Sequence, residues 1–188
     1  MGCGFRIDTS GGPANLLNTM SSIKIEIAGE QDSEVIREIY QTAFLEEESA
    51  MVTKLSVDLL AEKTIPKILS LVAREIEKTL GHVAFSPLEI ENNESCKASI
   101  LAPLAVHPEH QQKKVGSRLI EFGMKKLKEA GVNIVFVYGD PEFYRKFGFH
   151  ADTANDFQAP YDLEYPFGWQ ALIPQDWTDK THLQQLLV

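Results

Sequence analysis

The alternation of apolar and polar residues predicts a strand and two helices at the start of the chain. Residues 23–28 alternate Ile and polar residues, which is the period of a strand with one buried face. Asp32 then offers a helix cap, and apolar residues at helical spacing predict a helix that ends near Phe44. A second helical stripe follows the acidic run 46–48, and its members are Met51, Val52, Leu55 and Leu59.

The middle of the chain changes to the pattern of strands. Residues 67–74 and 79–88 are short and rich in Ile, Leu, Val and Phe, so they predict an antiparallel hairpin. The run ASILAPLAV at 98–106 predicts a central strand, although Pro103 inside it has no amide to donate to a ladder. We therefore expect a bulge or a local splaying of the sheet at Pro103.

The remaining pattern completes a mixed α/β fold. Residues 111–130 predict a long amphipathic helix, and 133–138 predict a buried strand. Asp140 and a following proline mark the start of a short helix that stops at Gly148, and 167–173 is the best late strand. The predicted order β, α, α, β, β, β, α, β, α, β, β is that of an α/β (α+β) domain around a mostly antiparallel sheet.

Size and composition favour one domain in a reducing compartment. The chain has 188 residues, of which 44% are hydrophobic and 24% charged, so it can bury a substantial core. Its two cysteines, Cys3 and Cys96, are far apart and lack metal-ligand spacing. No apolar run is long enough to span a bilayer, and the first residues lack the apolar centre of a secretory signal. We therefore expect a cytoplasmic protein that needs no metal and does not contact a membrane.

The charge balance bears on the partners of the protein. The formal net charge is −9 and the pI is about 5.0. Nucleic-acid binding usually depends on a basic surface, so nucleic acid is an unfavourable partner. A cationic small molecule suits the acidic balance better.

An anion-binding junction is predicted at VHPEHQQKKVGSRLI, residues 106–120. A strand ends there and a helix begins, and the first amides of a helix have no intrahelical partner. Lys113 and Lys114 add two cations at the same point. A solvated basic helix start explains this segment alone equally well. It is not a Walker loop, because no Gly-Lys-Ser/Thr follows.

Read together, LAPLAVHPEHQQKKVGSRLI and GDPEFYRKFGF resemble the GNAT superfamily of acyl-CoA N-acyltransferases. Together with GHVAFSP, these segments resemble one branch of predicted bacterial acetyltransferases. The resemblance extends over nearly the whole chain from Ile23. It implies a single GNAT domain at 22–188 after a flexible N-terminal extension at 1–21. It also implies a sheet whose middle strands splay apart, with helices on both faces.

The resemblance implies a site for acetyl-CoA. In GNAT enzymes the pattern Gln/Arg-x-x-Gly-x-Gly/Ala surrounds the CoA pyrophosphate with backbone amides. Gln111, Lys114 and Gly116 stand at its defined positions, and Lys114 replaces the usual first glycine. The full predicted segment is Gln111, Gln112, Lys113, Lys114, Val115, Gly116 and Ser117.

The strand before this segment is implied to hold the pantetheine arm. By similarity, Leu104 and Val106 offer backbone groups to the arm, and an amide near Leu104 or Ala105 polarises the thioester carbonyl. A plain buried strand is the alternative interpretation of LAPLAV.

The resemblance also implies catalytic residues. Tyr144 matches the tyrosine that protonates the departing CoA thiolate in many GNAT enzymes, and packing on Phe143 and Phe147 is the alternative. Glu48 stands where the related branch has a glutamate that serves as general base, although the acidic run also fits a solvated turn. His82 is a second candidate base.

The predicted activity is transfer of an acetyl group from acetyl-CoA to a primary amine by direct attack in a ternary complex. The amine belongs to an unidentified small molecule or peptide, and an aromatic cluster is a candidate wall for it: Tyr161, Tyr165, Phe167 and Trp169. GNAT proteins often form dimers, so the resemblance also raises a homodimer. Two alternatives remain: a non-catalytic CoA-binding or partner-binding module with this fold, and a nucleotide-binding or phosphotransfer fold.

Overall fold

A computed structural model of the chain describes residues 23–91, 93 and 95–173. The predicted extension at 1–21 lies outside the described residues, as does the end of the chain from 174. None of the described helices combines the length and the apolar character that crossing a membrane requires. The described elements run in this order: β1 (Lys24–Ile27), η1 (Glu30–Asp32), α1 (Ser33–Ala43), α2 (Glu46–Ala61), β2 (Leu69–Glu75), β3 (Lys78–Leu88), β4 (Ala98–Val106), η2 (Pro108–His110), α3 (Val115–Glu129), β5 (Ile134–Tyr138), α4 (Pro141–Arg145), α5 (Ala151–Ala154), η3 (Pro166–Gly168) and β6 (Trp169–Leu172).

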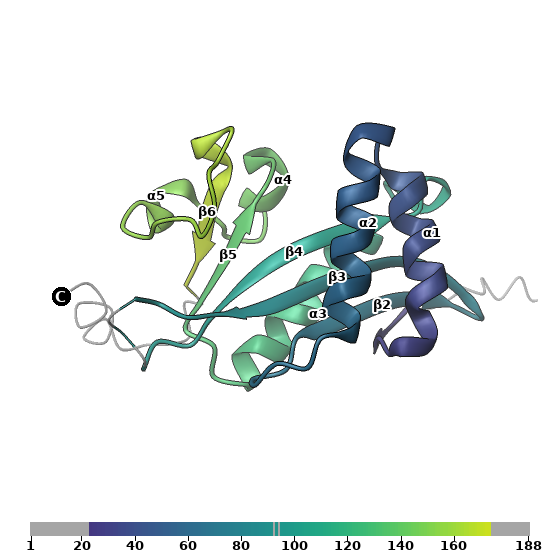
Figure 1. The fold of residues 1–188 in the computed structure, drawn as a ribbon, viewed down its shortest axis with the longest axis horizontal. Coiled ribbons are helices and arrows are strands. Elements are labelled where there is room, and N and C mark those ends of the chain that lie inside the picture. The colour runs from purple at the N-terminus through teal and green to yellow at the C-terminus, as the bar shows by residue number, and fades with distance from the viewer. Residues whose placement is uncertain (1–22, 92, 94, 174–188) are drawn as a thin grey trace, which may run out of the picture.

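The strands form one six-stranded sheet in the order β1-β2-β3-β4-β5-β6. All neighbours are antiparallel except β4 and β5, which run parallel because α3 connects them across the sheet. Helices α1 and α2 cover one face of the sheet and α3 lies behind the other (Figure 1). The predicted mixed fold, with its mostly antiparallel sheet and helices on both faces, is confirmed.

Each face of the sheet has its own core. On one face, Leu119 and Ile120 of α3 pack with Phe85 and Val135 from the strands. On the other, α1 buries the positions that its helical spacing predicts, namely Ile36, Ile39 and Tyr40. A third cluster joins β5, β6 and α5. The chain therefore buries apolar residues on both sides of its central strands, as in a layered α/β domain.

The prediction of which residues the second helix buries is wrong. Met51 and Leu55 are 68% and 41% exposed, whereas the small polar residues Thr53 and Ser56 are buried. Small side chains allow close packing of α2, and Ser56 Oγ donates to the Thr53 carbonyl at 2.8 Å. The acidic run at 46–48 is not a separate turn, because it forms the first turn of α2.

Three smaller predictions also need correction. The strand pattern at 23–28 implied that Ile27 is buried, but it is 71% exposed near the sheet edge. The helix predicted to begin at Gln111 begins at Val115, and η2 precedes it. The predicted order ends in two strands, but only β6 follows α4 as a strand in the described part of the chain, together with an isolated bridge at His150.

The middle of the sheet opens as predicted. β4 pairs with β3 as far as Val106, but it pairs with β5 only from Ala98 to Leu101. The register between β3 and β4 shifts opposite Ala102 and Pro103, so proline sits where the ladder is already interrupted. Beyond Leu101 the two parallel strands therefore splay apart.

Candidate active site

The start of α3 presents backbone amides to the splayed end of β4. The first intrahelical bond joins the Arg118 amide to the Lys114 carbonyl at 3.0 Å. The amides of residues 115–117 precede that bond, so they are available to an anion, and the helix dipole favours negative charge there. Gln111 Nε2 donates to the Val106 carbonyl at 3.2 Å and ties the turn to the end of β4.

Lys114 adopts the conformation that a glycine would supply. Its φ is +61° and that of Gln112 is +60°, so the turn passes through the left-handed region twice. A side chain in that region is disfavoured by about 1 kcal/mol relative to glycine. Lys114 therefore has a backbone conformation that glycine adopts without strain, and it adds an exposed cation to the turn.

Gly116 lies where three elements meet. A Cβ added to it would lie 3.5 Å from Val106 Cγ2, 3.9 Å from Leu104 Cδ2 and 3.9 Å from Phe143 Cζ. These are ordinary van der Waals distances, so alanine fits this position and longer side chains meet neighbours. The start of α3, the end of β4 and α4 therefore converge on this glycine.

The predicted pantetheine strand presents mainly its backbone. Ala105 is buried against the α1 side, while Leu104 and Val106 are half-buried on the α3 side. The side chain of Val115 is buried, so only its amide can serve a ligand. Gln112, Lys113 and Lys114 are exposed, and Gly116 and Ser117 are half-buried.

Tyr144 lies on α4, beyond the end of β5. Asp140 caps this helix by accepting from the Glu142 amide at 2.9 Å, as the sequence predicts. The Tyr144 ring packs edge-on against Phe143 and Phe149. Burial, with a smaller contribution from the nearby Asp140, raises the pKa of Tyr144 to about 12. The phenol therefore carries its proton at neutral pH, which a general acid requires.

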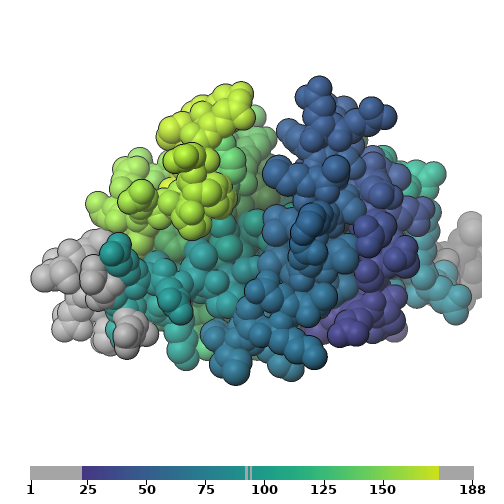
Figure 2. Space-filling model, viewed as in Figure 1, coloured from purple at the N-terminus to yellow at the C-terminus, as the bar shows by residue number. Residues whose placement is uncertain are grey.

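Figure 2 shows a hollow in the surface between α2 and the segment that leads from α5 to β6. We call this hollow the cleft. Figure 1 shows that β4 and β5 pass beneath it and that α1 lies on the far side of α2. The cleft therefore lies over the splayed ends of the two middle strands.

Glu48 is exposed in the first turn of α2. Residues of a helix follow one another at about 100°, so Glu48 shares a flank with Val52 and Leu55. The other flank faces α1, because its residues line a pocket together with side chains of α1. Glu48 is therefore on the flank of α2 that faces the cleft.

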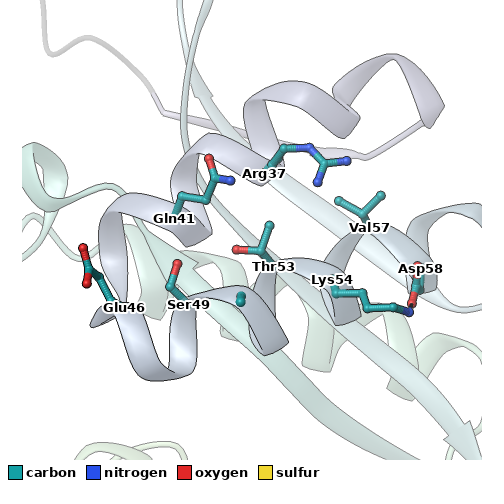
Figure 3. A pocket seen from close by; sticks show the side chains of 9 residues that line it. Arg37, Gln41, Glu46, Ser49, Thr53, Lys54, Val57 and Asp58 are labelled. Atoms are coloured by element: carbon teal, nitrogen blue, oxygen red, sulfur yellow. Dashed lines mark hydrogen bonds and ion pairs between the residues drawn. The ribbon is translucent and has the colours of Figure 1, made fainter.

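That pocket, of about 370 Å³, lies between α1 and α2 (Figure 3). Charges of both signs line it, and Lys54 is paired with Asp58 one helical turn away. It lies on the opposite flank of α2 from the cleft, so it is separate from the predicted acetyl-CoA site. Its lining residues are Arg37, Gln41, Glu46, Ser49, Ala50, Thr53, Lys54, Val57 and Asp58.

His82 belongs to a buried hydrogen-bond network under α1. Its Nδ1 lies 3.0 Å from Tyr40 Oη, and its Nε2 lies 2.7 Å from Ser70 Oγ. Burial lowers the pKa of His82 to about 3, and Asp32 opposes that shift only partly. A neutral imidazole with both nitrogens engaged explains this histidine as a packing residue, and its partners could not be predicted from the sequence.

His107, Glu109 and His110 lie together beside the turn. Their ligand atoms lie within 4.8 Å of one another, which is close enough for the three side chains to hold one metal ion. Glu109 already forms an ion pair with Lys78, with 3.1 Å between Oε2 and Nζ, and His107 Nδ1 accepts from the Glu109 amide. A metal would have to displace these partners.

The aromatic residues at the end of the chain divide into two groups. Trp169 stacks on Phe136 at 4.9 Å and is buried, so it is a core residue rather than part of a pocket wall. Tyr161, Tyr165 and Phe167 remain exposed. Sequence reasoning missed Tyr138, the last residue of β5, whose hydroxyl accepts from the Tyr165 amide at 3.0 Å. Its place at the end of a buried strand was the available signal.

Known proteins share this arrangement. Residues 24–151 match the family described as acetyltransferase (GNAT) domain. An Escherichia coli K12 protein, the uncharacterized N-acetyltransferase YjhQ, is 33% identical over 172 residues, which cover 88% of this chain and 93% of that protein. The chain belongs to the GNAT acetyltransferase family.

Solved structures of GNAT proteins resemble this one and hold the cofactor. A GNAT acetyltransferase from Brucella melitensis in complex with acetyl-CoA is 29% identical, with a TM-score of 0.62, over 81% of this chain and 88% of that one. The GNAT N-acetyltransferase YhbS from Escherichia coli in complex with CoA is 26% identical, with a TM-score of 0.67, over 80% and 81% of the two chains. Proteins similar to this GNAT member thus bind CoA in this fold.

Proposed function

We propose that this GNAT protein transfers an acetyl group from acetyl-CoA to a primary amine by direct attack in a ternary complex. The observation that carries the proposal is the splaying of β4 and β5 beside the start of α3, whose first amides are not capped by the Lys114 side chain. The pantetheine arm lies between the splayed strands, and the pyrophosphate binds the turn at 111–117. An amide near Leu104 or Ala105 polarises the thioester carbonyl.

The chemical step needs a base for the ammonium group of the acceptor and an acid for the departing thiolate. Glu48, on the cleft flank of α2, accepts a proton from the ammonium group of the acceptor, directly or through water. The nitrogen lone pair attacks the thioester carbon, the new C–N bond forms, and the C–S bond breaks. Tyr144 donates its proton to the departing sulfur, and the second proton of the attacking nitrogen leaves to solvent. No residue of the chain is acetylated on this path.

Thiol release in the presence of amines tests this proposal. Purified protein is incubated with acetyl-CoA and primary amines, free CoA thiol is followed, and the acetylated product is identified by mass. We expect amine-dependent thiol release, with kcat about 100-fold lower in Glu48→Gln. Tight CoA binding with no thiol release across the amine panel would favour the non-catalytic module instead. Glu47→Gln, one residue away in the same exposed turn, is the matched control.

A further inference from the structure

The cleft has an apolar wall on α2. The flank of α2 that faces it carries Leu55 and Leu59 after Glu48, by the helical spacing of about 100° per residue, whereas Val52 packs partly into the core under α1. Leu55 is 41% exposed, so it is not used by the protein core. An exposed leucine beside a carboxylate suits a ligand that has both an apolar body and a positive charge.

The opposite wall is aromatic and is fixed to the end of β5. Tyr161, Tyr165 and Phe167 are 47%, 52% and 63% exposed. Tyr138 ends β5, and it anchors this group through the hydrogen bond from the Tyr165 amide and an edge-on contact with the Tyr161 ring at 6.3 Å. The Gly139 amide also donates to the Gly168 carbonyl at 3.0 Å. The aromatic rings are therefore held where the middle strands splay.

The charge near the cleft complements a cation. Residues 151–173 contain no lysine, arginine or histidine, whereas Asp162 and Glu164 are exposed among the aromatic residues. On α2, Lys54 belongs to the opposite flank and is paired with Asp58. Aromatic faces attract ammonium groups, so the aromatic wall adds to this preference.

We infer that the acceptor is a primary amine carried on an aromatic or alkyl body, rather than a polyamine or a sugar amine. This inference rests on the proposed function and names its substrate class. The apolar body contacts Leu55 on one side and the exposed rings of Tyr165 and Phe167 on the other. Its single ammonium group lies toward Glu48, where the base takes the proton.

Selectivity between amines tests the inference. The kcat/KM for 2-phenylethylamine is compared with those for ethanolamine and spermidine at saturating acetyl-CoA. Because burying a ring of this size contributes about 1.5–3 kcal/mol, we expect 2-phenylethylamine to be preferred by about 10- to 100-fold. Equal values, or a preference for spermidine or ethanolamine, would overturn the inference while leaving the acetyltransferase proposal intact. Absence of thiol release with every amine would overturn both.

Variants of the aromatic wall separate a binding role from a structural one. Phe167→Ala and Tyr165→Ala remove exposed rings, so the fold should keep its melting temperature. We expect kcat/KM for 2-phenylethylamine to fall about tenfold in each, with ethanolamine changed by less than about twofold. Ile27→Ala, which truncates an exposed apolar residue at the other edge of the sheet, should leave both values unchanged. Parallel losses for both amines would contradict a wall that recognises the apolar body.

Discussion

Lys114 holds a left-handed backbone conformation, with φ of +61°, in the turn that we propose binds the pyrophosphate. Two effects of this residue oppose each other. Its conformation is disfavoured for any residue with a Cβ, whereas its ammonium group adds positive charge where phosphates bind. We therefore expect Lys114 to lower the stability of the protein slightly and to attract the cofactor electrostatically.

Two substitutions separate these effects. Lys114→Ala removes the charge and keeps the strain, whereas Lys114→Gly removes both. We expect Lys114→Gly to have a free energy of unfolding about 1 kcal/mol higher than Lys114→Ala in urea denaturation. Both variants should bind acetyl-CoA more weakly than the wild type at low salt, and the difference should shrink as NaCl is added. Equal stabilities of the two variants would show that the turn relaxes in solution.

Tyr144 is predicted to act through its hydroxyl rather than through its ring. Tyr144→Phe keeps the edge-on packing against Phe143 and Phe149, so the fold should be retained. We expect kcat to fall about 100-fold while the Kd for acetyl-CoA changes by less than about twofold. Steady-state kinetics and calorimetry measure the two quantities. An unchanged kcat would remove Tyr144 from the mechanism.

His82 makes stability depend on pH. Burial lowers its folded-state pKa to about 3, below the value of about 6.5 expected in the unfolded chain. Its contribution to stability is therefore complete above about pH 6.5 and is lost as the pH falls toward about 3. We expect the free energy of unfolding to drop by up to about 1.4 kcal/mol per pH unit in this window because of this residue alone.

The variant His82→Gln provides the comparison. It keeps a neutral polar side chain between Tyr40 and Ser70 but does not titrate. It should be less stable than the wild type at pH 7 and should show a shallower pH dependence in urea denaturation between pH 6 and pH 4. Identical slopes would mean that carboxyl groups alone account for the acid sensitivity.

At the scale of elements, α3 packs on β3 through a glycine. A Cβ on Gly123 would lie 2.2 Å from Cε2 of the buried Phe85 ring. Gly123→Ala should therefore destabilise the protein by about 1–3 kcal/mol, despite the better helix propensity of alanine. Gly116→Ala is the matched control on the same helix, since its Cβ has room, and it should not destabilise.

A second substitution checks the cause of that loss. Phe85→Leu opens space beneath position 123, so the double variant should be less destabilised than the sum of the two single variants. Thermal or urea denaturation of the four proteins gives the coupling energy. Additive effects would show that the contact with Phe85 does not account for the loss.

The sequence predicts the elements better than their faces. The periodicity at 23–28, 111–130 and 133–138 identifies real strands and a real helix, because burial on one side imposes the repeat. It fails on α2, where small polar residues rather than Met51 and Leu55 face the core. Hydrophobicity alone does not reveal close packing through small side chains, nor an apolar flank that is exposed in a cleft.

The candidate site was only partly accessible to sequence reasoning. The motif around Gly116 and the position of Tyr144 follow from the resemblance to the GNAT family. Their convergence at Val106 and Phe143 depends on how far β4 and β5 splay, which is a long-range property. The position of Tyr138 at the end of a buried strand could be predicted, but its hydrogen bond with the Tyr165 amide could not. The buried partners of His82 could not be predicted either, because hydrogen bonds between distant segments leave no local pattern.

At the scale of the whole molecule, the two sides of the splayed strands have different chemistry. The start of α3 carries lysines and free helical amides that suit phosphates. The cleft on the α2 side carries carboxylates, exposed leucine and aromatic rings that suit an amine. A net charge of −9 therefore coexists with a local cationic turn, and the donor and acceptor can approach the thioester from separate regions.

A crystal structure of the protein with acetyl-CoA tests the central claim most directly. The account predicts pyrophosphate oxygens about 3 Å from the amides of residues 115–117, the pantetheine arm between β4 and β5, and the sulfur within about 3.5 Å of Tyr144 Oη. A cofactor bound elsewhere, or a Tyr144 hydroxyl turned away from the sulfur, would contradict it.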